Sequence, residues 1–305
     1  MSTPALGFWR RFRRQRAAVL SAVLLLLLLV GSFGTLPWSV RGMRTQQLQA
    51  ARRPPSPAYP LGTDEVGRSL LWRMLYGGAI SLSLGLLAAG LAVGIGTAYG
   101  AAAGYVGGRC DAVMMRVVDV LYALPTLLLV MLFTVSIGSV LQHGLSLSGE
   151  AARFVVLALA IGGVSWLTVA RVVRGQVLSL REQPFIEAAR ALGLPTHRIL
   201  LRHLLPNLAG PIIVFATLTV PQAILQESFL SFLGVGVQPP QATWGSLAAD
   251  GVRALNPVRF DWWLVVFPGA ALAVTLLALN FVGDGLRDAL DVRRGVGAPG
   301  RSVAG

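Results

Sequence analysis

Long runs without a charged side chain constrain this chain more than any other feature of its sequence. Six stand out: 24 residues between Arg16 and Arg41, 35 between Arg73 and Arg109, 30 between Asp119 and Glu150, 17 between Arg153 and Arg171, 24 between Arg202 and Glu227, and 22 between Asp261 and Asp284. A helix that crosses a bilayer needs about 20 mostly apolar residues, because it rises about 1.5 Å per residue through roughly 30 Å of hydrocarbon. The runs therefore predict an all-α membrane protein with six transmembrane helices.

The composition indicates the same class. Hydrophobic residues make up 54% of the 305 residues and charged residues only 13%, whereas soluble domains carry about 25% charged residues. So few charges could not cover the surface of a soluble fold of this length. Arginines that face anionic lipid headgroups explain the net charge of +13 better than nucleic acid does. We therefore expect membrane lipid as a partner and no nucleic acid.

Residues that the chain lacks exclude several chemistries. It contains no lysine, so it cannot form a phosphate-binding G-x-x-x-x-G-K-[ST] loop or a lysine Schiff base. Its single cysteine, Cys110, cannot form an internal disulfide and has no nearby cluster of metal ligands. Neither G-x-S-x-G nor H-E-x-x-H occurs. We expect a protein that is not an enzyme, with no catalytic residue, metal or cofactor of its own, so any ATP that drives it must be hydrolysed by another subunit.

The distribution of arginines predicts the orientation of the spans, because cytoplasmic loops are enriched in basic residues. With a cytoplasmic N-terminus, 17 of the 26 arginines lie inside and nine lie outside. Both termini are then cytoplasmic. The first span also resembles a secretory signal peptide, but its apolar stretch exceeds the about 7–15 residues of such a segment and no clear A-x-A site follows. We therefore favour an uncleaved anchor.

Three segments follow from this pattern. Residues 1–77 are expected to form an N-terminal anchor helix and an extracytoplasmic loop, which ends in a short helix from Leu70 that lies along the membrane surface. Residues 78–286 are expected to form a five-helix domain that includes a cytoplasmic loop at 181–206. Residues 287–305 are expected to form a cytoplasmic tail.

Glycines recur at four-residue spacing in the second span, at Gly90, Gly94, Gly96, Gly100 and Gly104. Small residues at this spacing let two helices approach closely in lipid. One interpretation is packing within this chain, which we favour because glycine is common in membrane helices. The other is an interface with a second subunit.

The loop at 181–206 has the sequence of two short helices joined at a corner. Pro184 suits a first helical turn, and Gly193 suits the left-handed position that ends a helix. Pro195 is expected to start the second helix and Pro206 to end it. Such a defined shape favours insertion into a groove on another protein, although a plain surface linker is the usual alternative for a charged loop.

The chain resembles a known family in three ordered motifs. Glu187-Ala188-Ala189, then Gly193, then Leu205-Pro206 resembles the EAA-x3-G-x9-I-x-L-P loop of bacterial ABC importer permeases, with His203 in place of isoleucine. The stretches 59–68, 76–82 and 227–236, followed by Gln238-Pro239-Pro240 and Trp244-Gly245, are similar to the C-type permeases of dipeptide, oligopeptide and nickel importers. The resemblance covers most of the chain from about residue 60 onward.

This resemblance implies a type-1 ABC importer permease bundle in the bacterial inner membrane. It implies as partners a second homologous permease, two cytoplasmic ABC ATPases and an extracytoplasmic solute-binding protein. The EAA loop of the family docks in the ATPase. The residues assigned to that contact are Glu187, Ala188, Ala189, Leu192, Gly193 and Pro206, with Arg190 and Arg198 added because their charge suits acidic ATPase residues.

Polar residues in the fifth span mark a second candidate site. Thr219, Gln222 and Gln226 recur at i, i+3 and i+7, and Glu227 lies one step further around the helix. Polar side chains in lipid either bond to neighbouring helices or line water, and ionisable ones are functional candidates. We assign these four residues to the translocation pathway, with a structural role for Glu227 as an equal alternative.

The predicted function is therefore that of a membrane-spanning permease subunit of an ATP-driven importer. The resemblance favours dipeptides or oligopeptides as substrates, with nickel or another small solute as the alternative. An autonomous six-span carrier or channel is a further alternative. Carriers usually have buried charges in the middle of the membrane, which this sequence nearly lacks.

Overall fold

The structure is a computed structural model that describes residues 4–144, 149–255 and 260–290. Every named element within these ranges is helical, and strand pairing is limited to one isolated bridge between Thr63 and Ser69. The elements are α1 (Pro4–Arg14), α2 (Arg16–Gly34), α3 (Leu36–Gly42), η1 (Leu48–Ala50), α4 (Leu70–Val106), α5 (Gly108–Tyr122), α6 (Thr126–Gly144), α7 (Gly149–Arg181), α8 (Pro184–Ala191), α9 (Thr196–Ile199), η2 (Leu200–Leu204), α10 (Leu205–Phe232), α11 (Trp244–Arg253) and α12 (Trp263–Leu290).

Five helices are long and apolar enough to cross a membrane. They are α2, α4, α7, the continuous helix Thr196–Phe232 that contains α9, η2 and α10, and α12. The helices α5 and α6 pass the same test as a pair, bent by 93°, so the chain has six spans if that pair counts as one. This confirms the predicted all-α membrane fold.

The chain bends sharply near the start of the third charge-free run, which begins after Asp119 and holds α6 and the last turn of α5. The break lies at residues 123–125, between α5 and α6. Pro125 explains it, because proline has no N–H to donate and disfavours the helical conformation at the preceding residue, here Leu124. The backbone resumes as a helix at once, with the N–H of Leu129 donating to the carbonyl of Pro125 (3.1 Å).

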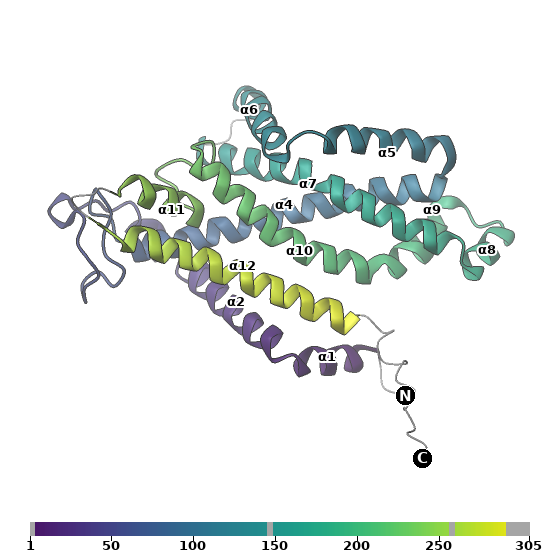
Figure 1. Ribbon diagram of the computed structural model, residues 1–305, viewed down its shortest axis with the longest axis horizontal. Coiled ribbons are helices and arrows are strands. Elements are labelled where there is room, and N and C mark those ends of the chain that lie inside the picture. Colours follow the sequence, from purple (N-terminus) through teal and green to yellow (C-terminus); the bar gives the residue numbers. More distant parts are fainter. Residues whose placement is uncertain (1–3, 145–148, 256–259, 291–305) are drawn as a thin grey trace, which may run out of the picture.

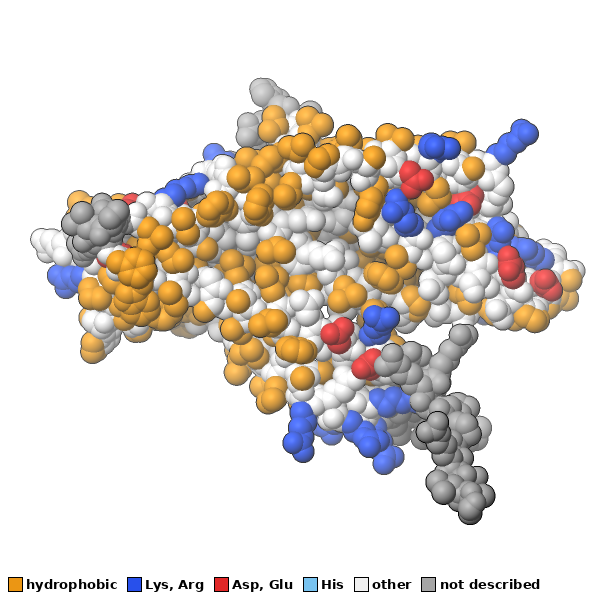
Figure 2. Space-filling model, viewed as in Figure 1, with side chains coloured by type: hydrophobic (Ala, Val, Ile, Leu, Met, Phe, Trp, Pro, Cys, Tyr) orange, Lys and Arg blue, Asp and Glu red, His pale blue; other side chains and the backbone are white. Residues whose placement is uncertain are grey.

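The spans run side by side along the long axis of the molecule (Figure 1). α2 packs against α12 and α4, and α7 packs against α4 and α6. Both α1 and the C-terminal end of α12 point toward the end that carries α8, which we call the α8 end, and α11 lies at the opposite end, the α11 end. Figure 2 shows hydrophobic side chains across the middle of one face and charged side chains toward the two ends.

The repeated glycines of α4 divide into two groups. A Cβ atom on Gly96, Gly100 or Gly104 would lie 2.8, 2.3 or 2.9 Å from a backbone oxygen of α7. These three glycines therefore allow α4 and α7 to pack backbone against backbone. Gly90 and Gly94 have nothing within 4 Å of an added Cβ, so packing within the chain explains only three of the five.

Two expectations about helix boundaries are wrong. The short surface helix from Leu70 does not exist as a separate element, because α4 continues without a break from Leu70 to Val106. The expected boundary at residue 77 thus falls inside α4. Pro206 does not end a helix either, because the π-helical turn η2 precedes it and the N–H of Leu205 bonds to the carbonyl of Leu200. Proline fits this first turn of α10, where its missing N–H costs little.

The two termini differ in how much of the predicted segments the structure describes. The anchor helix α2 packs closely on the bundle, since Gly78 of α4 approaches Ser32 and Gly285 of α12 approaches Ala18. Residues 287–290 of the expected tail continue α12, and residues 291–305 lie outside the described residues.

We expect Gly100→Leu to disrupt the α4–α7 contact, because its side chain would meet the backbone carbonyl of Ala170. Overpacking of this kind costs about 1–3 kcal/mol or more. The matched control is Gly90→Leu on the same helix, which has open space. The measurement is the melting temperature of each purified variant in detergent, and equal melting temperatures would contradict the packing role.

Candidate functional site

The loop at the α8 end forms the predicted two-helix corner. Pro184 lies in the first turn of α8, and Gly193 adopts the left-handed conformation with φ of +72°. The N–H of Leu194 donates to the carbonyl of Ala189 (3.2 Å), and that of Gly193 donates to Arg190 (2.9 Å). This pair of hydrogen bonds is a Schellman motif, which needs a residue without a Cβ clash at the position of Gly193.

One face of α8 packs into the chain and the other is open. Ile186 and Ala189 are buried in a cluster that includes Val177 of α7 and Ile199 and Leu204 of the following helix. The loop residues assigned to a partner are otherwise exposed: Glu187, Ala188, Arg190, Leu192, Gly193, Arg198 and Pro206. Leu192 is 80% exposed, although it is a large apolar residue.

Two arginines tie this loop to the end of α4. The guanidinium of Arg190 lies over the ring of Tyr105, 5.0 Å from its centroid. Nη1 of Arg181 donates to the carbonyl of Gly104 (3.0 Å). Arg190 is therefore already in contact with α4, although its side chain is exposed.

The polar residues of α10 do not share one environment. Thr219 is buried and donates to the carbonyl of Phe215 on its own helix (2.7 Å). Gln222 is exposed, and Gln226 is half-buried. Glu227 is 0% exposed and accepts a hydrogen bond from Oγ of Ser231 (2.7 Å). Only Gln222 fully faces out of the chain in this conformation, so the assignment of the set to a pathway stays a prediction.

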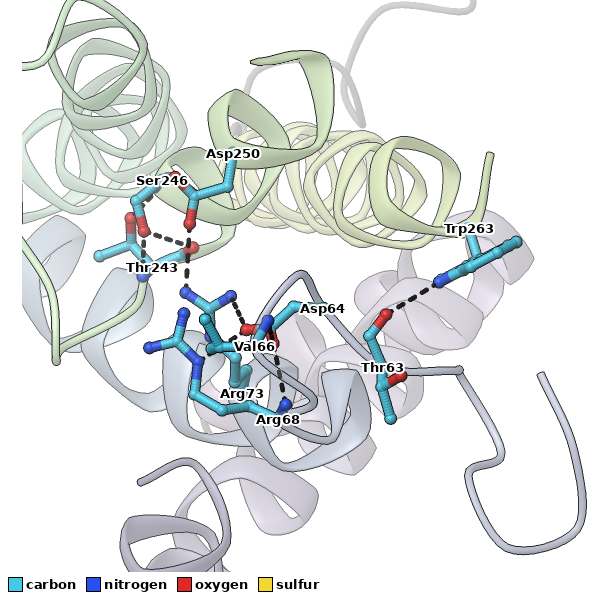
Figure 3. Close-up of polar contacts among 9 residues, drawn as sticks. All are labelled: Thr63, Asp64, Val66, Arg68, Arg73, Thr243, Ser246, Asp250 and Trp263. Atoms are coloured by element: carbon cyan, nitrogen blue, oxygen red, sulfur yellow. Dashed lines mark hydrogen bonds and ion pairs between the residues drawn. The ribbon is translucent and has the colours of Figure 1, made fainter. Parts of the chain in front are cut away.

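A buried ion network lies at the α11 end, and we name it the Arg73 cluster: Asp64, Arg68, Arg73 and Asp250 (Figure 3). Arg73 is 3% exposed and donates to Oδ2 of Asp64 (2.9 Å) and to Oδ2 of Asp250 (3.2 Å). Nε of Arg68 donates to Oδ2 of Asp64 (2.6 Å). Backbone N–H groups of Val66 and Arg68 donate to the other oxygen of Asp64. A buried charge is tolerated when it is paired in this way.

The Arg73 cluster joins the loop before α4 and the first turn of α4 to α11, which is distant in the sequence. Nearby contacts strengthen the joint. Thr243 and Ser246 form a capping box at the start of α11, and Nε1 of Trp244 donates to the carbonyl of Met74 on α4 (3.0 Å). Nε1 of Trp263 donates to the carbonyl of Thr63 (3.2 Å). Asp64 and Arg68 belong to the stretch 59–68 that resembles the C-type permeases, but nothing in the sequence indicated that Asp250 lies beside them.

Comparison with known proteins identifies the family. The family model described as "Binding-protein-dependent transport system inner membrane component" matches residues 90–296. This chain belongs to that family. A second model, described as the N-terminal TM domain of oligopeptide transport permease C, matches residues 3–55 of the permease. It is a multi-pass inner-membrane protein and a transport component, not an enzyme.

Curated relatives are similar over most of the permease. The dipeptide transport system permease protein DppC of Bacillus subtilis is 42% identical, with 93% of this chain and 84% of the relative covered. The oligopeptide transport system permease protein OppC of Escherichia coli K12 is 43% identical, with 92% and 89% covered. The OppC of Bacillus subtilis is 40% identical, with 95% and 92% covered.

A solved structure shows the same fold. The permease matches a chain of the inward-facing MetNI methionine ABC transporter with a TM-score of 0.56 over 72% of this chain and 97% of that chain. The sequence identity is only 19%, so this likeness concerns the fold alone. It confirms the predicted type-1 ABC importer permease bundle.

We expect Arg73→Gln to destabilise the permease, because it removes the cation that pairs with both Asp64 and Asp250. Breaking a buried pair costs about 3–5 kcal/mol, and we expect about 2–4 kcal/mol here because Asp64 keeps Arg68. The measurement is thermal unfolding in detergent. Arg44→Gln removes an exposed pair with Glu150 and should change stability by less than about 1 kcal/mol. Equal effects of the two substitutions would contradict a stabilising role for the cluster.

Proposed function

We propose that this permease imports dipeptides or oligopeptides, as one of two homologous permease subunits. The observation that carries the substrate class is the identity of about 40% to dipeptide and oligopeptide permeases over nearly the whole chain. The other partners are two cytoplasmic ABC ATPases, which hydrolyse the ATP, and an extracytoplasmic solute-binding protein. The chain itself binds no cofactor.

The α8 loop is the proposed contact with an ATPase. Its open face offers Leu192 and Glu187 to a groove, and the Schellman motif at Gly193 holds them in one shape. Its other face is packed through Ile186 and Ala189 against α7 and the helix that becomes α10. A displacement of α8 would therefore move those spans as well, which is the coupling that import requires.

The proposed pathway lies between α10 and the second permease. Gln222 is exposed on α10, so it faces outward from this chain, where a second subunit would complete a passage. Thr219, Gln226 and Glu227 are within one or two turns of it and belong to the same proposed site. Polar groups there would interact with the peptide bonds of a substrate.

Uptake measurements test the substrate class. Cells that depend on this permease and its partner subunits are expected to take up radiolabelled dipeptides or oligopeptides, with loss of uptake when this chain is deleted. The same cells are tested with labelled Ni²⁺. Nickel uptake without peptide uptake would overturn the proposed substrate and leave the family assignment unchanged.

We expect Leu192→Asp to release the ATPases from the complex without unfolding the permease, because this side chain is 80% exposed. Leu48→Asp is the matched control, since Leu48 is 75% exposed in η1 near the opposite end. The measurement is recovery of ATPases and of the second permease with each tagged variant in mild detergent. Full recovery of ATPases with Leu192→Asp would contradict docking at α8.

The single cysteine tests the proposed orientation, in which the α8 end and both termini are cytoplasmic. Cys110 is exposed in the first turn of α5, close to that end. We expect a membrane-impermeant maleimide to label it only after the cells are permeabilised. The control is Cys110→Ser combined with Leu48→Cys, which should react in intact cells. Labelling of Cys110 in intact cells would reverse the orientation.

A further inference from the structure

Two cavities adjoin each other along α4, and their linings differ in chemistry. The first has a volume of about 600 Å³ and lies between α4 and the helix from α9 to α10, with almost entirely apolar walls. Its lining residues are Val93, Gly94, Thr97, Ala98, Ala101, Ala102, His197, Leu200, Leu201, Leu205 and Ile212. The second has a volume of about 450 Å³ and is lined by Tyr105, Val106, Arg181, Arg190 and Thr196.

The positions of these residues make the two cavities parts of one groove. Ala101 and Ala102 of the apolar cavity lie one helical turn before Tyr105 and Val106 of the cationic one, so both cavities use the same face of α4. On the opposite wall, Thr196 of one cavity directly precedes His197 of the other. The groove opens outward, because Gly94 has nothing within 4 Å and Val106 is 61% exposed.

The length of the groove matches one leaflet of a bilayer. From Val93 to Val106 the helix advances about 20 Å at 1.5 Å per residue. Half of a bilayer measures about 20–22 Å when its headgroup region is included. The apolar part of the groove is then at the depth of acyl chains, and the arginines are at the depth of the phosphates, in the leaflet at the α8 end.

The cationic part is preorganised for an anion. Arg181 is held by its bond to the carbonyl of Gly104, and Arg190 is held over Tyr105. Neither is ion-paired with a carboxylate in the part of the chain that the structure describes. The two acidic residues of the neighbouring α5 pair with other arginines: Asp111 with Arg174 at 2.6 Å and Asp119 with Arg171 at 2.9 Å.

We propose that this groove binds an anionic phospholipid, whose phosphate contacts Arg181 and Arg190 and whose acyl chain lies against Gly94, Ala98 and Leu201. Basic pockets between transmembrane helices on the cytoplasmic side suit such headgroups, and arginine matches phosphate with two hydrogen bonds at once. An acidic side chain of a protein partner would use the arginines but would leave the apolar groove empty. A phospholipid fills both.

The bound lipid would connect several helices at the α8 end of the bundle. It contacts α4, α8 and α9 at once, and α8 is the element that the proposed coupling moves. The inference does not depend on the transported substrate. It requires only that the groove faces lipid when the permease is assembled with its partners.

Native mass spectrometry of the permease, purified in mild detergent with its copurifying subunits and titrated with dioleoyl-phosphatidylglycerol, tests the proposal. We expect the double substitution Arg181→Gln and Arg190→Gln to weaken binding by about tenfold or more, since each basic residue near an anionic lipid contributes about a factor of five. The matched control is Arg109→Gln with Arg116→Gln, two exposed arginines of the neighbouring α5 that line neither cavity. Arg190→Lys should bind with intermediate affinity, because it keeps the positive charge but loses the two-bond match to phosphate.

A second pair of variants tests the apolar part. Gly94→Leu should fill the groove and lower lipid binding, whereas Gly90→Leu, on the same helix but outside the groove, should not; both have open space for the side chain. Equal lipid binding by wild type and the double glutamine variant would overturn the proposal. So would loss of the second permease from Gly94→Leu with lipid binding unchanged, because the groove would then be a subunit interface.

Discussion

The backbone contact between α4 and α7 is the constraint on which the rest of this permease depends. Lipid offers no hydrophobic gain when two apolar helices meet, so association relies on close van der Waals packing. Gly96, Gly100 and Gly104 provide it, because their missing side chains let backbone oxygens of α7 approach α4. The remaining spans take their places around this pair, with α10 and α2 on α4 and α6 on α7.

The two ends of the bundle are stabilised differently. At the α11 end, the Arg73 cluster and the tryptophan hydrogen bonds join the loop before α4, α4 itself and α11 through buried polar contacts, which are geometrically strict. At the α8 end, the loop is held by a small apolar cluster and by arginines that contact α4. The contacts that join segments at the α11 end are thus ionic and hydrogen-bonded, whereas the α8 loop is held mainly by apolar packing.

Features set by local chemistry could be predicted from the sequence. The spans follow from apolar length, and the corner at Gly193 follows from a conformation that glycine adopts without strain. Features that depend on contacts between distant segments could not. The sequence around Arg73 does not indicate that Asp250 is its partner. Nor does the sequence around Arg190 indicate a contact with Tyr105, which lies 85 positions earlier. Pro125 and Pro206 show a third case, since Pro125 follows a break between two helices whereas Pro206 lies within the continuous helix Thr196–Phe232, directly after a π-helical turn.

The continuity of Thr196–Phe232 has a mechanical consequence. At about 1.5 Å per residue this helix is roughly 55 Å long, so a single rod reaches from beside the α8 corner to the far side of the bundle. It has three joints: the π-helical turn before Pro206, and the interior prolines Pro211 and Pro221, where the backbone lacks an N–H donor. A displacement of the end near α8 would move each straight part of this helix as a rigid unit, and the helix would bend at these three sites. One helix of the permease thus links the α8 corner to the opposite end of the bundle and can bend at defined positions along its length.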